Sequence, residues 1–477
     1  MGRRVKLVCT LGPATAGRDS VRSLAEAGTD VFRVNMSHGD PDAHAASVRD
    51  ARAAAEALGR ELAVMADLPG PKIRLGELPA DGVWLEPGAR FDLRADDVPG
   101  DASGASTTYA GLAGDLEVGD RVLLADGAAE LLVRSVRDAT VTCEVVRGGH
   151  VRSRAGVNVP AERLGVPAIT DRDRRALASA LELEVDLIAQ SFVRAASDVA
   201  DLRTLMGDRA LPVVAKIETR PAVEAIDEVL RGADAIMVAR GDLGVEIGDA
   251  ELPGVQKRLI RLARGADRAV ITATQMMQSM VNASLPTRAE VLDVANAVID
   301  GTDAVMLSEE TAVGRYPVEA VAAMARICEG AERQREAMIG GYRTDEGFTR
   351  VDESIAMAAM YVANRLPVKA IAALTESGDT ALWMSRVGSG IPIYALTPHR
   401  QTLRRVTLYR GVYPVAFTAA GNEPAAINAA LIEVLRREGV VAPGDLVIAT
   451  KGDLTGVHGG TSALKILQVG AAPAAAA

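Results

Sequence analysis

The sequence predicts an α/β protein: a (β/α)8 TIM barrel with an inserted small β-barrel cap domain and a C-terminal α/β domain. Three observations predict it. Short apolar runs alternate with helical patterns eight times in the first 334 residues. One long interruption after the third run is rich in turns and alternating strands. A second series of strands and helices follows a polar stretch near residue 340.

The eight apolar runs are spaced like the strands of a parallel barrel. They begin at Val5, Asp30, Glu61, Val185, Pro212, Asp234, Ala269 and Asp303. Runs that are apolar almost throughout are typical of strands buried on both faces. Each is followed by a helical pattern with one apolar face, as in PAVEAIDEVLRGA. Eight such units favour a closed (β/α)8 barrel.

The interruption lies between Leu68 and Val185 and has a different character. Turn segments such as EPGAR, VGDR and ADGAAE separate alternating stretches such as AELLVRSVRDATVTCEVV. This pattern is typical of a small all-β domain. Because it follows the carboxyl end of a strand, where barrel enzymes form their active sites, we expect a movable cap. We place the cap at residues 76–160, between barrel segments 1–75 and 161–335.

The remainder of the chain reads as a further α/β domain over residues 336–477. Residues 335–351 are polar and contain glycine, which suits a linker. Strand-like runs such as AIAALTES, PIYALTP and DLVIATKG then alternate with helical patterns. The final GAAPAAAA is expected to fray.

Composition excludes several classes of protein. The chain has 477 residues, which suggests roughly three domains. Its net charge of −10 and only 14 aromatic residues argue against a nucleic-acid or membrane partner. The three cysteines, Cys9, Cys143 and Cys328, are odd in number and far apart, which excludes a disulfide framework or a CxxC metal site. With no signal peptide pattern, we expect a cytoplasmic location.

Polar residues gather where the predicted strands end. They are Arg33, Asn35, Ser37, Asp67, Lys216, Glu218, Arg240, Asp242, Thr274 and Ser308. Any one of them has an ordinary structural explanation, as a helix cap or a surface ion pair. In a barrel, however, all these strand ends meet at one mouth, so their coincidence favours an active site.

The segment AKIET carries the clearest chemical signal. Lys216 and Glu218 are two residues apart, so both side chains lie on the same side of a strand. Glu218 and Asp242 can share one divalent cation, and two carboxylates with open positions favour Mg²⁺ or Mn²⁺ completed by water and substrate oxygens. A purely structural Lys–Glu pair remains the alternative. Neither a GxxxxGK[ST] loop nor the protein-kinase motif set is present.

Several long segments, in order, resemble the pyruvate kinase family over essentially the whole chain. They are CTLGPAT, FRVNMSHG, DLPGPKIR, GVNVP, AKIET, MVARGDLGVEI, TATQMMQSM, PTRAEVLDVANAV and AVMLSEETAVGRYP. The family has a barrel, a β cap inserted after the third strand and a C-terminal effector domain. The resemblance therefore implies an enzyme of glycolysis that transfers the phosphoryl group of phosphoenolpyruvate to ADP, giving pyruvate and ATP.

The resemblance also implies roles for particular residues. Lys216 would neutralise charge on the phosphoryl group and the enolate, while Glu218 and Asp242 would hold Mg²⁺. Phosphoenolpyruvate would be positioned by Arg33, Ala239, Arg240, Gly241, Asp242 and Thr274. The nucleotide would face Asn35, Ser37, His38, Arg74 and Arg154. The family's proton relay would fall on Thr274 and Ser308. Such positioning and cationic charge are what phosphoryl transfer needs.

Two positions depart from the family pattern. Many members read DTKGPEIR and need K⁺, whereas this chain has DLPGPKIR, with Leu68 and Lys72 at the altered positions. A lysine ammonium can supply the charge of a monovalent cation, so we expect activity without K⁺. The alternative is that Lys72 lies on the surface and that Asn35, Ser37 and Asp67 still bind K⁺. The second departure is Glu309, where many members have glycine, and no expectation follows from it.

The C-terminal domain carries a candidate effector site in TESGDT. Thr375, Ser377, Gly378 and Thr380 open a helical pattern, where backbone amides and hydroxyls suit a phosphate. By resemblance the ligand is a sugar phosphate or a nucleotide, and the loop 451–461 closes over it. A capped helix without a ligand is the alternative. The resemblance further implies a homotetramer.

Two other functions remain as rivals. One is a barrel lyase or aldolase that binds pyruvate-like enolates through Mg²⁺. The β insertion, the nucleotide-side residues Asn35 and Arg74, and the TATQMM segment argue against it. The other is a catalytically silent sensor, against which the intact Lys216, Glu218 and Asp242 argue.

Overall fold

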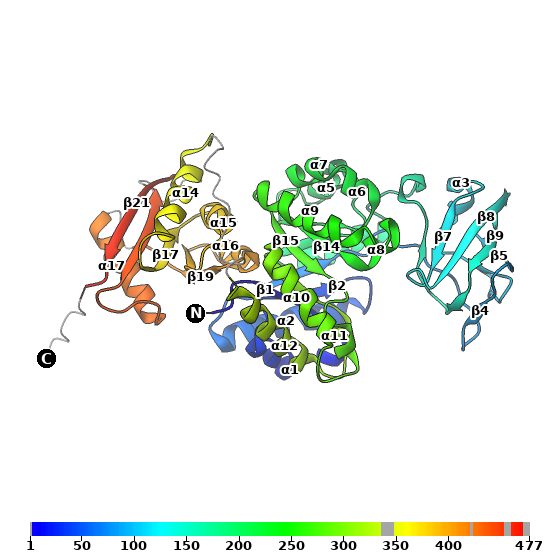
Figure 1. The fold of residues 1–477 in the computed structure, drawn as a ribbon, viewed down its shortest axis with the longest axis horizontal. Helices are drawn as coiled ribbons and strands as arrows, with labels where there is room; N and C mark the ends of the chain where they lie inside the picture. The colour runs from blue at the N-terminus through cyan, green and yellow to red at the C-terminus, as the bar shows by residue number, and fades with distance from the viewer. Residues whose placement is uncertain (1, 335–347, 420–422, 453–458, 471–477) are drawn as a thin grey trace. The chain divides into compact units, whose positions relative to one another are not determined.

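The computed structural model describes residues 2–334, 348–419, 423–452 and 459–470 (Figure 1). Eight strands form a closed barrel in the order β1-β16-β15-β14-β13-β12-β3-β2, which confirms the predicted fold class. Their bounds are β1 Lys6–Leu11, β2 Val31–Asn35, β3 Ala63–Asp67, β12 Leu187–Gln190, β13 Val213–Ile217, β14 Ala235–Ala239, β15 Ala269–Ala273 and β16 Ala304–Leu307.

The barrel strands are buried on both faces, as their apolar runs predict. Every residue of β1, β3, β14 and β15 is buried. Neighbouring strands pair in parallel; β1, for example, pairs with β16 through Lys6 and Ala304 and with β2 through Val8 and Val31. Parallel pairing brings the carboxyl ends of paired strands to the same edge.

Helices follow these strands along the chain. Their bounds are α1 Arg18–Ala27, α2 Pro41–Leu58, α4 Asp171–Glu182, α5 Ala196–Met206, α6 Arg220–Glu224, α7 Ile226–Gly232, α8 Arg240–Ile247, α9 Leu252–Gly265, α10 Arg288–Asp300, α11 Glu309–Ala312 and α12 Pro317–Glu332. Local sequence sets their ends. At α10, the Thr287 side chain accepts a hydrogen bond from the Glu290 N–H in a capping box. At α2, Asp40 caps the helix and Pro41 occupies its first turn.

The chain divides into two compact units. One comprises Met1–Ala66, Leu183–Leu187 and Ile260–Ala477, and the other comprises Asp67–Glu182 and Ile188–Leu259. The first unit therefore carries β1, β2, β15, β16 and the C-terminal sheet. The second carries β13, β14 and the inserted β segment.

The insertion is rich in β structure, as expected. Its strands form a six-stranded sheet in the order β11-β7-β8-β9-β5-β6 and a two-stranded sheet of β10 and β4. The bounds are β4 Val83–Leu85, β5 Arg90–Arg94, β6 Gly104–Ser106, β7 Arg121–Leu124, β8 Ala129–Arg137, β9 Thr140–Arg147, β10 Gly149–Val151 and β11 Val157–Asn158, with a short helix α3 Leu112–Asp115. Phe91, Leu131, Val133 and Val145 are among the residues of its own hydrophobic core.

The C-terminal segment forms a five-stranded sheet in the order β19-β18-β17-β20-β21, in which only β21 is antiparallel to its neighbour. The bounds are β17 Val368–Leu374, β18 Ile393–Thr397, β19 Val412–Ala416, β20 Leu446–Gly452, β21 Thr461–Gln468, α14 Val351–Ala363, α15 Asp379–Arg386, α16 Arg400–Arg405 and α17 Pro424–Arg437. Most of the expected linker, the middle of loop 451–461 and the last seven residues lie outside the described residues.

A buried ion pair joins this sheet's helices to the barrel strands of the same unit. Arg386, the last residue of α15, forms a two-pronged pair with Asp303, which immediately precedes β16. Asp303 also accepts hydrogen bonds from the N–H groups of Val270 and Arg410, at 3.0 and 3.1 Å. The two side chains are almost entirely buried. Breaking such a pair leaves a buried charge without its partner, at a cost of about 3–5 kcal/mol.

Cys9, Cys143 and Cys328 are free and buried. Within the described ranges, no helix is both long and apolar enough to cross a membrane.

Candidate active site

A partly buried lysine between two buried carboxylates forms the centre of the site in the second unit. Lys216 lies on β13, and its Nζ is 2.9 Å from Glu218 Oε1 and 3.4 Å from Asp67 Oδ1. Asp67 and Glu218 are only 1 and 3 % exposed. Two buried acids beside one lysine form a group whose charges are costly to bury unless each is paired or binds a cation.

Two residues that sequence reasoning missed hold this group in place. Lys216 Nζ donates to Ser191 Oγ at 2.7 Å, and the Ser191 hydroxyl donates to the Leu68 carbonyl at 2.8 Å. The N–H of Phe192 donates to Glu218 Oε2 at 2.7 Å. Phe192 does so with φ of 53°, a left-handed conformation that a bulky residue rarely adopts. Such strain is characteristic of functional sites.

A glycine permits this close packing. A Cβ on Gly70, whose φ is 67°, would lie 2.7 Å from Ser191 Cβ and 2.9 Å from the Phe192 ring. Only glycine allows the loop after β3 to approach so closely. The sequence signal for this contact was the segment QSF at the end of the fourth strand, to which no site residue was assigned.

A second lysine–carboxylate pair lies beside the first group. Lys72 Nζ is 2.8 Å from Asp242 Oδ1, and both side chains are partly exposed. Asp242 belongs to the first turn of α8, which begins at Arg240, so the predicted stretch Ala239–Asp242 forms the start of a helix. Lys72 therefore makes an ion pair with a predicted metal ligand instead of projecting freely from the surface.

The electrostatics of Glu218 connect the two pairs. Burial raises the pKa of Glu218, and the nearby Asp242 charge raises it further, against the opposing effect of Lys216. A carboxylate whose charged form is disfavoured in this way is stabilised by an added cation. The donor set of Glu218 and Asp242 consists of hard oxygen atoms, so these residues fit a Mg²⁺ ion. Among the described residues, no cluster of three or more acids, histidines or cysteines offers a closed metal cage.

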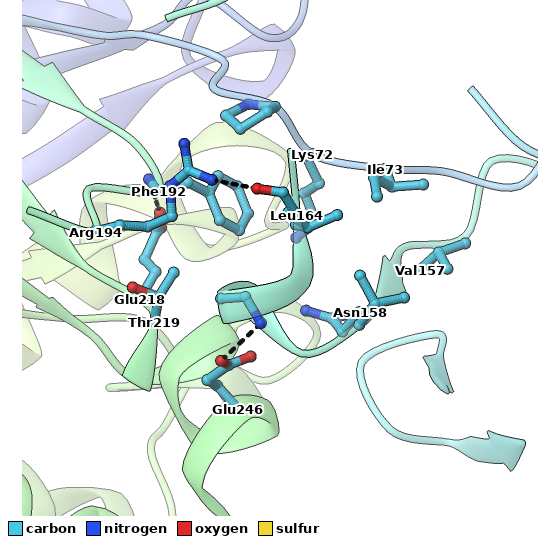
Figure 2. A pocket seen from close by; sticks show the side chains of 13 residues that line it. Lys72, Ile73, Val157, Asn158, Leu164, Phe192, Arg194, Glu218, Thr219 and Glu246 are labelled. Atoms are coloured by element: carbon cyan, nitrogen blue, oxygen red, sulfur yellow. Dashed lines mark hydrogen bonds between the residues drawn. The ribbon is translucent and has the colours of Figure 1, made fainter. Parts of the chain in front are cut away.

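Figure 2 shows the pocket that opens beside Glu218. It has a volume of about 40 Å³ and is lined by Lys72, Phe192, Arg194, Glu218 and Glu246, among others. Arg194 donates hydrogen bonds to the carbonyls of Leu164 and Val166, so its guanidinium stabilises the backbone of this segment. The pocket is therefore bordered by Glu218 and, for most of the rest of its lining, by apolar residues.

The two predicted nucleotide-side arginines of this unit lie together. Arg74 Nη1 donates to the carbonyl of Arg154 at 3.1 Å, and Arg154 pairs with Glu77 at 2.8 Å. Arg154 has φ of 63°. Arg154 is exposed and Arg74 is partly exposed.

In the first unit, Arg33 and the turn after β2 form another group. Arg33 Nη1 donates to Thr10 Oγ1 at 3.0 Å. Asn35 Oδ1 accepts from the Ser37 N–H at 3.1 Å, and Asn35 Nδ2 lies 3.3 Å from His38 Nδ1. The structure thus brings Asn35, Ser37 and His38 into one turn.

The two predicted proton-relay residues follow β15 and β16 of the same unit. Thr274 has φ of 67°, and its hydroxyl donates to the Ala273 carbonyl at 2.6 Å. Ser308 immediately precedes α11. A β-branched residue in the left-handed region is strained by about 1–3 kcal/mol, so the surrounding structure has to hold it there.

The altered positions of the sequence have different environments. The side chain of Leu68 is buried, and its N–H donates to the Ala189 carbonyl at 2.9 Å. Glu309, by contrast, is exposed, and it accepts a hydrogen bond from Gln278 Nε2 at 2.8 Å.

Three of the four predicted effector residues, Thr375, Ser377 and Thr380, line a pocket of about 150 Å³ in the C-terminal segment, and Gly378 is not part of its lining. Thr375 Oγ1 accepts from the Gly378 N–H at 2.9 Å, and Thr380 Oγ1 lies 3.0 Å from Thr461 Oγ1. Gly378 has φ of 92° at the start of α15. The charged residues of the lining are Asp352, Glu376, Asp379 and Lys451.

A closed parallel barrel with charged side chains gathered near the carboxyl ends of its strands is the arrangement of a TIM-barrel enzyme. Comparison with known proteins makes the assignment specific. Residues 2–321 match the family model of the pyruvate kinase barrel domain, and residues 353–467 match that of the pyruvate kinase alpha/beta domain.

Curated relatives match along nearly the whole chain. Pyruvate kinase II of Salmonella typhimurium is 46 % identical over 98 % of this chain and 99 % of its own. Pyruvate kinase of Haemophilus influenzae is 44 % identical over 94 % of this chain and 96 % of its own, and that of Mycobacterium intracellulare is 41 % identical over 98 and 99 %. The chain belongs to the pyruvate kinase family and is a phosphotransferase, which confirms the resemblance and excludes the lyase rival.

Proposed function

We propose that the enzyme transfers the phosphoryl group of phosphoenolpyruvate to ADP with Mg²⁺ held by Glu218 and Asp242, and without a requirement for K⁺. The observation that carries the proposal is the buried group in which Lys216 lies between Asp67 and Glu218, next to the Lys72–Asp242 pair. Its carboxylate oxygens suit a divalent cation, and its lysine suits a phosphoryl group.

Lys216 is the residue proposed to act on the transferring group. In the reaction, the bond between phosphorus and the enol oxygen breaks and a bond to an oxygen of the ADP β-phosphate forms. Bound Mg²⁺ would neutralise phosphoryl and enolate oxygens. The Lys216 ammonium, oriented by Ser191 and Asp67, adds a fixed positive charge where negative charge develops. Because this charge is already in place before the reaction, little rearrangement of the site is needed as the transition state forms.

The other predicted residues bind, orient and donate a proton. Arg33 and the backbone of Ala239–Asp242 at the start of α8 would hold phosphoenolpyruvate through its anionic groups. Asn35, Ser37, His38, Arg74 and Arg154 would face the nucleotide phosphates and sugar. The hydroxyls of Thr274 and Ser308 would deliver the proton that converts the enolate to pyruvate at carbon.

Independence from K⁺ is proposed from the charge of Lys72. Its ammonium is 2.8 Å from Asp242 and so adds a positive charge at the acidic group itself. The alternative, K⁺ bound by Asn35, Ser37 and Asp67, predicts activation by the ion.

We propose the regulation and the assembly of this enzyme from its membership of the pyruvate kinase family. Thr375, Ser377, Gly378 and Thr380 would bind the phosphate of a sugar phosphate or nucleotide, in the pocket that these residues line or border. A homotetramer, a cytoplasmic location and the division into a barrel domain (1–75 and 161–335), a cap (76–160) and an effector domain (336–477) belong to the same proposal.

The test is the rate of pyruvate formation from phosphoenolpyruvate and ADP, followed through lactate dehydrogenase at constant ionic strength with and without K⁺. We expect ADP- and Mg²⁺-dependent activity that K⁺ changes less than twofold, and K⁺ activation in the variant Lys72→Glu. A large rate increase of the unaltered enzyme on adding K⁺ would refute independence from K⁺ while leaving the phosphotransfer assignment in place.

A further inference from the structure

Beneath the loops of Thr274 and Ser308 lies a buried carboxylate to which no role has been given. Glu310 belongs to the short helix α11 and is 0 % exposed. Its Oε1 accepts a hydrogen bond from the Met277 N–H at 3.1 Å, and its Oε2 accepts one from the Ser308 N–H at 2.7 Å. One side chain therefore joins the loop after β15 to the loop after β16.

The loop after β15 needs such support because its backbone is strained. Thr274 and Gln275 both have left-handed φ angles, 67 and 54°. Non-glycine residues keep such angles only where the surrounding structure holds them. Buried side chains of Met276, Met277 and Met280 anchor the segment on one side, and the bond from the Met277 N–H to Glu310 fixes its backbone.

Glu310 is itself fixed. The next residue, Thr311, donates its hydroxyl to the Thr10 carbonyl at 2.8 Å, which ties α11 to the end of β1. A Cβ on Gly314 would lie 2.3 Å from the Glu310 carbonyl, so the chain after α11 is packed against this residue. Burial raises the pKa of the Glu310 carboxyl against the opposing effect of its backbone hydrogen bonds. Burying a carboxylate costs free energy, so we expect this side chain to contribute to the structure or function of the loops that it contacts.

We infer that Glu310 is a positioning residue for the proton-transfer step. By holding the backbone near Thr274 and at Ser308 with one carboxylate, it fixes the relative placement of the two hydroxyls that would deliver a proton to the enolate. The inference rests on the proposed function of these hydroxyls. It assigns Glu310 no contact with substrate.

The variant Glu310→Gln tests the inference because it keeps the shape but turns an NH₂ group toward a backbone N–H. We expect the exchange of pyruvate methyl hydrogens with deuterated water, measured by NMR with Mg²⁺ and ATP, to fall roughly 10- to 100-fold. The KM for phosphoenolpyruvate should change less than about twofold, and the solvent deuterium isotope effect on kcat should rise as protonation becomes rate-limiting. A merely structural role would lower the melting temperature without raising the isotope effect, and that result would overturn the inference.

The neighbouring carboxylate provides the matched control. Glu309→Gln alters an exposed acid on the same helix, bonded only to the Gln278 side chain among the described contacts, and should leave exchange at the wild-type rate. If Glu310→Gln does not fold, Glu310→Asp replaces it. This variant keeps the charge but is too short to reach both N–H groups, and wild-type exchange in the folded variant would overturn the inference.

A second pair of variants separates this inference from the proposed function. In a Thr274→Ala/Ser308→Ala background, the further change Glu310→Gln should have no additional effect on exchange, because the hydroxyls it positions are gone. Unchanged exchange in Thr274→Ala/Ser308→Ala itself would refute the hydroxyls' proposed role. Slowed exchange in that variant together with normal exchange in Glu310→Gln would refute the positioning role alone.

Discussion

Two lysines on barrel strands, the partly buried Lys216 and the buried Lys6, have opposite surroundings. Lys216, near the carboxyl end of β13, lies within 3.4 Å of both Asp67 and Glu218. Lys6, the first residue of β1, donates to the Val412 carbonyl at 2.6 Å and lies 4.6 Å from the centre of the Tyr413 ring. In the part of the chain that the structure describes, no ion pair is formed by Lys6.

The difference distinguishes the end of the barrel where we propose catalysis from the opposite end. Lys216 is ion-paired with two buried acids, which fits the proposal that this group also binds a divalent cation. Around Lys6 desolvation dominates, and burial lowers the pKa of Lys6 to about 8, partly offset by the Asp30 charge. This contrast agrees with the general division of TIM barrels, in which the carboxyl ends of strands carry catalysis and the amino ends carry stability.

The largest effect is expected at Lys216. Lys216→Met removes the charge proposed to stabilise the transferring group, and kcat should fall about 1,000-fold or more. The circular dichroism spectrum should stay that of the folded protein. Activity within tenfold of the wild-type rate would refute the proposed catalytic role of Lys216.

A smaller effect is expected at the neighbouring acid. Glu218→Gln should raise the Mg²⁺ concentration needed for half-maximal rate roughly 10- to 100-fold, because a proposed ligand is lost. Glu246→Gln is the control, since Glu246 lines the same pocket but accepts only two long backbone bonds, at 3.4 and 3.5 Å. Equal Mg²⁺ requirements in the two variants would contradict the metal assignment.

The lowered pKa of the buried Lys6 predicts that the free energy of unfolding depends on pH. Between about pH 8 and 10.5 the folded protein has lost the Lys6 proton that the unfolded chain still binds. The unfolded state then holds more protons, so this group makes the free energy of unfolding rise with pH, by at most about 3 kcal/mol over the window.

The measurement compares urea unfolding of wild type and Lys6→Met at pH 7.5 and pH 10. The stability of the wild type relative to the variant should increase at the higher pH. A difference that is the same at both pH values would show that Lys6 is charged equally in the folded and unfolded states.

The smallest effect is expected in the effector pocket, where the proposed phosphate donors are neutral hydroxyls and amides. Ser377→Ala should raise the half-activating concentration of glucose 6-phosphate or AMP only about 2- to 10-fold, the value of one hydrogen bond. A loss as large as that at Lys216 would mean that the pocket recognises its ligand by charge after all.

The strands and the charged site residues were predictable because their signals are local. Every barrel strand is an apolar run in the sequence, and Lys216 and Glu218 share a face through their spacing alone. The pairing of Lys72 with Asp242 joins positions 170 residues apart in the sequence. Neither segment alone indicates that the two side chains are in contact. Sequence reasoning placed both residues near the site but did not predict their contact.

The supporting residues were missed for a physical reason. Ser191 and Phe192 act through one hydroxyl and one backbone N–H, and Glu310 acts through two backbone N–H groups of distant loops. A backbone N–H is carried by every residue except proline, so no residue type marks its use. The left-handed φ angles of Phe192 and Thr274 could not be predicted from the sequence either, because both residue types ordinarily have negative φ angles.

The Arg386–Asp303 pair has a consequence for how this protein can be recombined with its relatives. A chimaera that took the C-terminal segment from one enzyme and the barrel from another would inherit one member of the pair from each parent. Unless both parents supply complementary groups at these two positions, the hybrid would bury a lone ion at its junction. Crossover points are therefore better judged by matching this pair than by overall sequence identity.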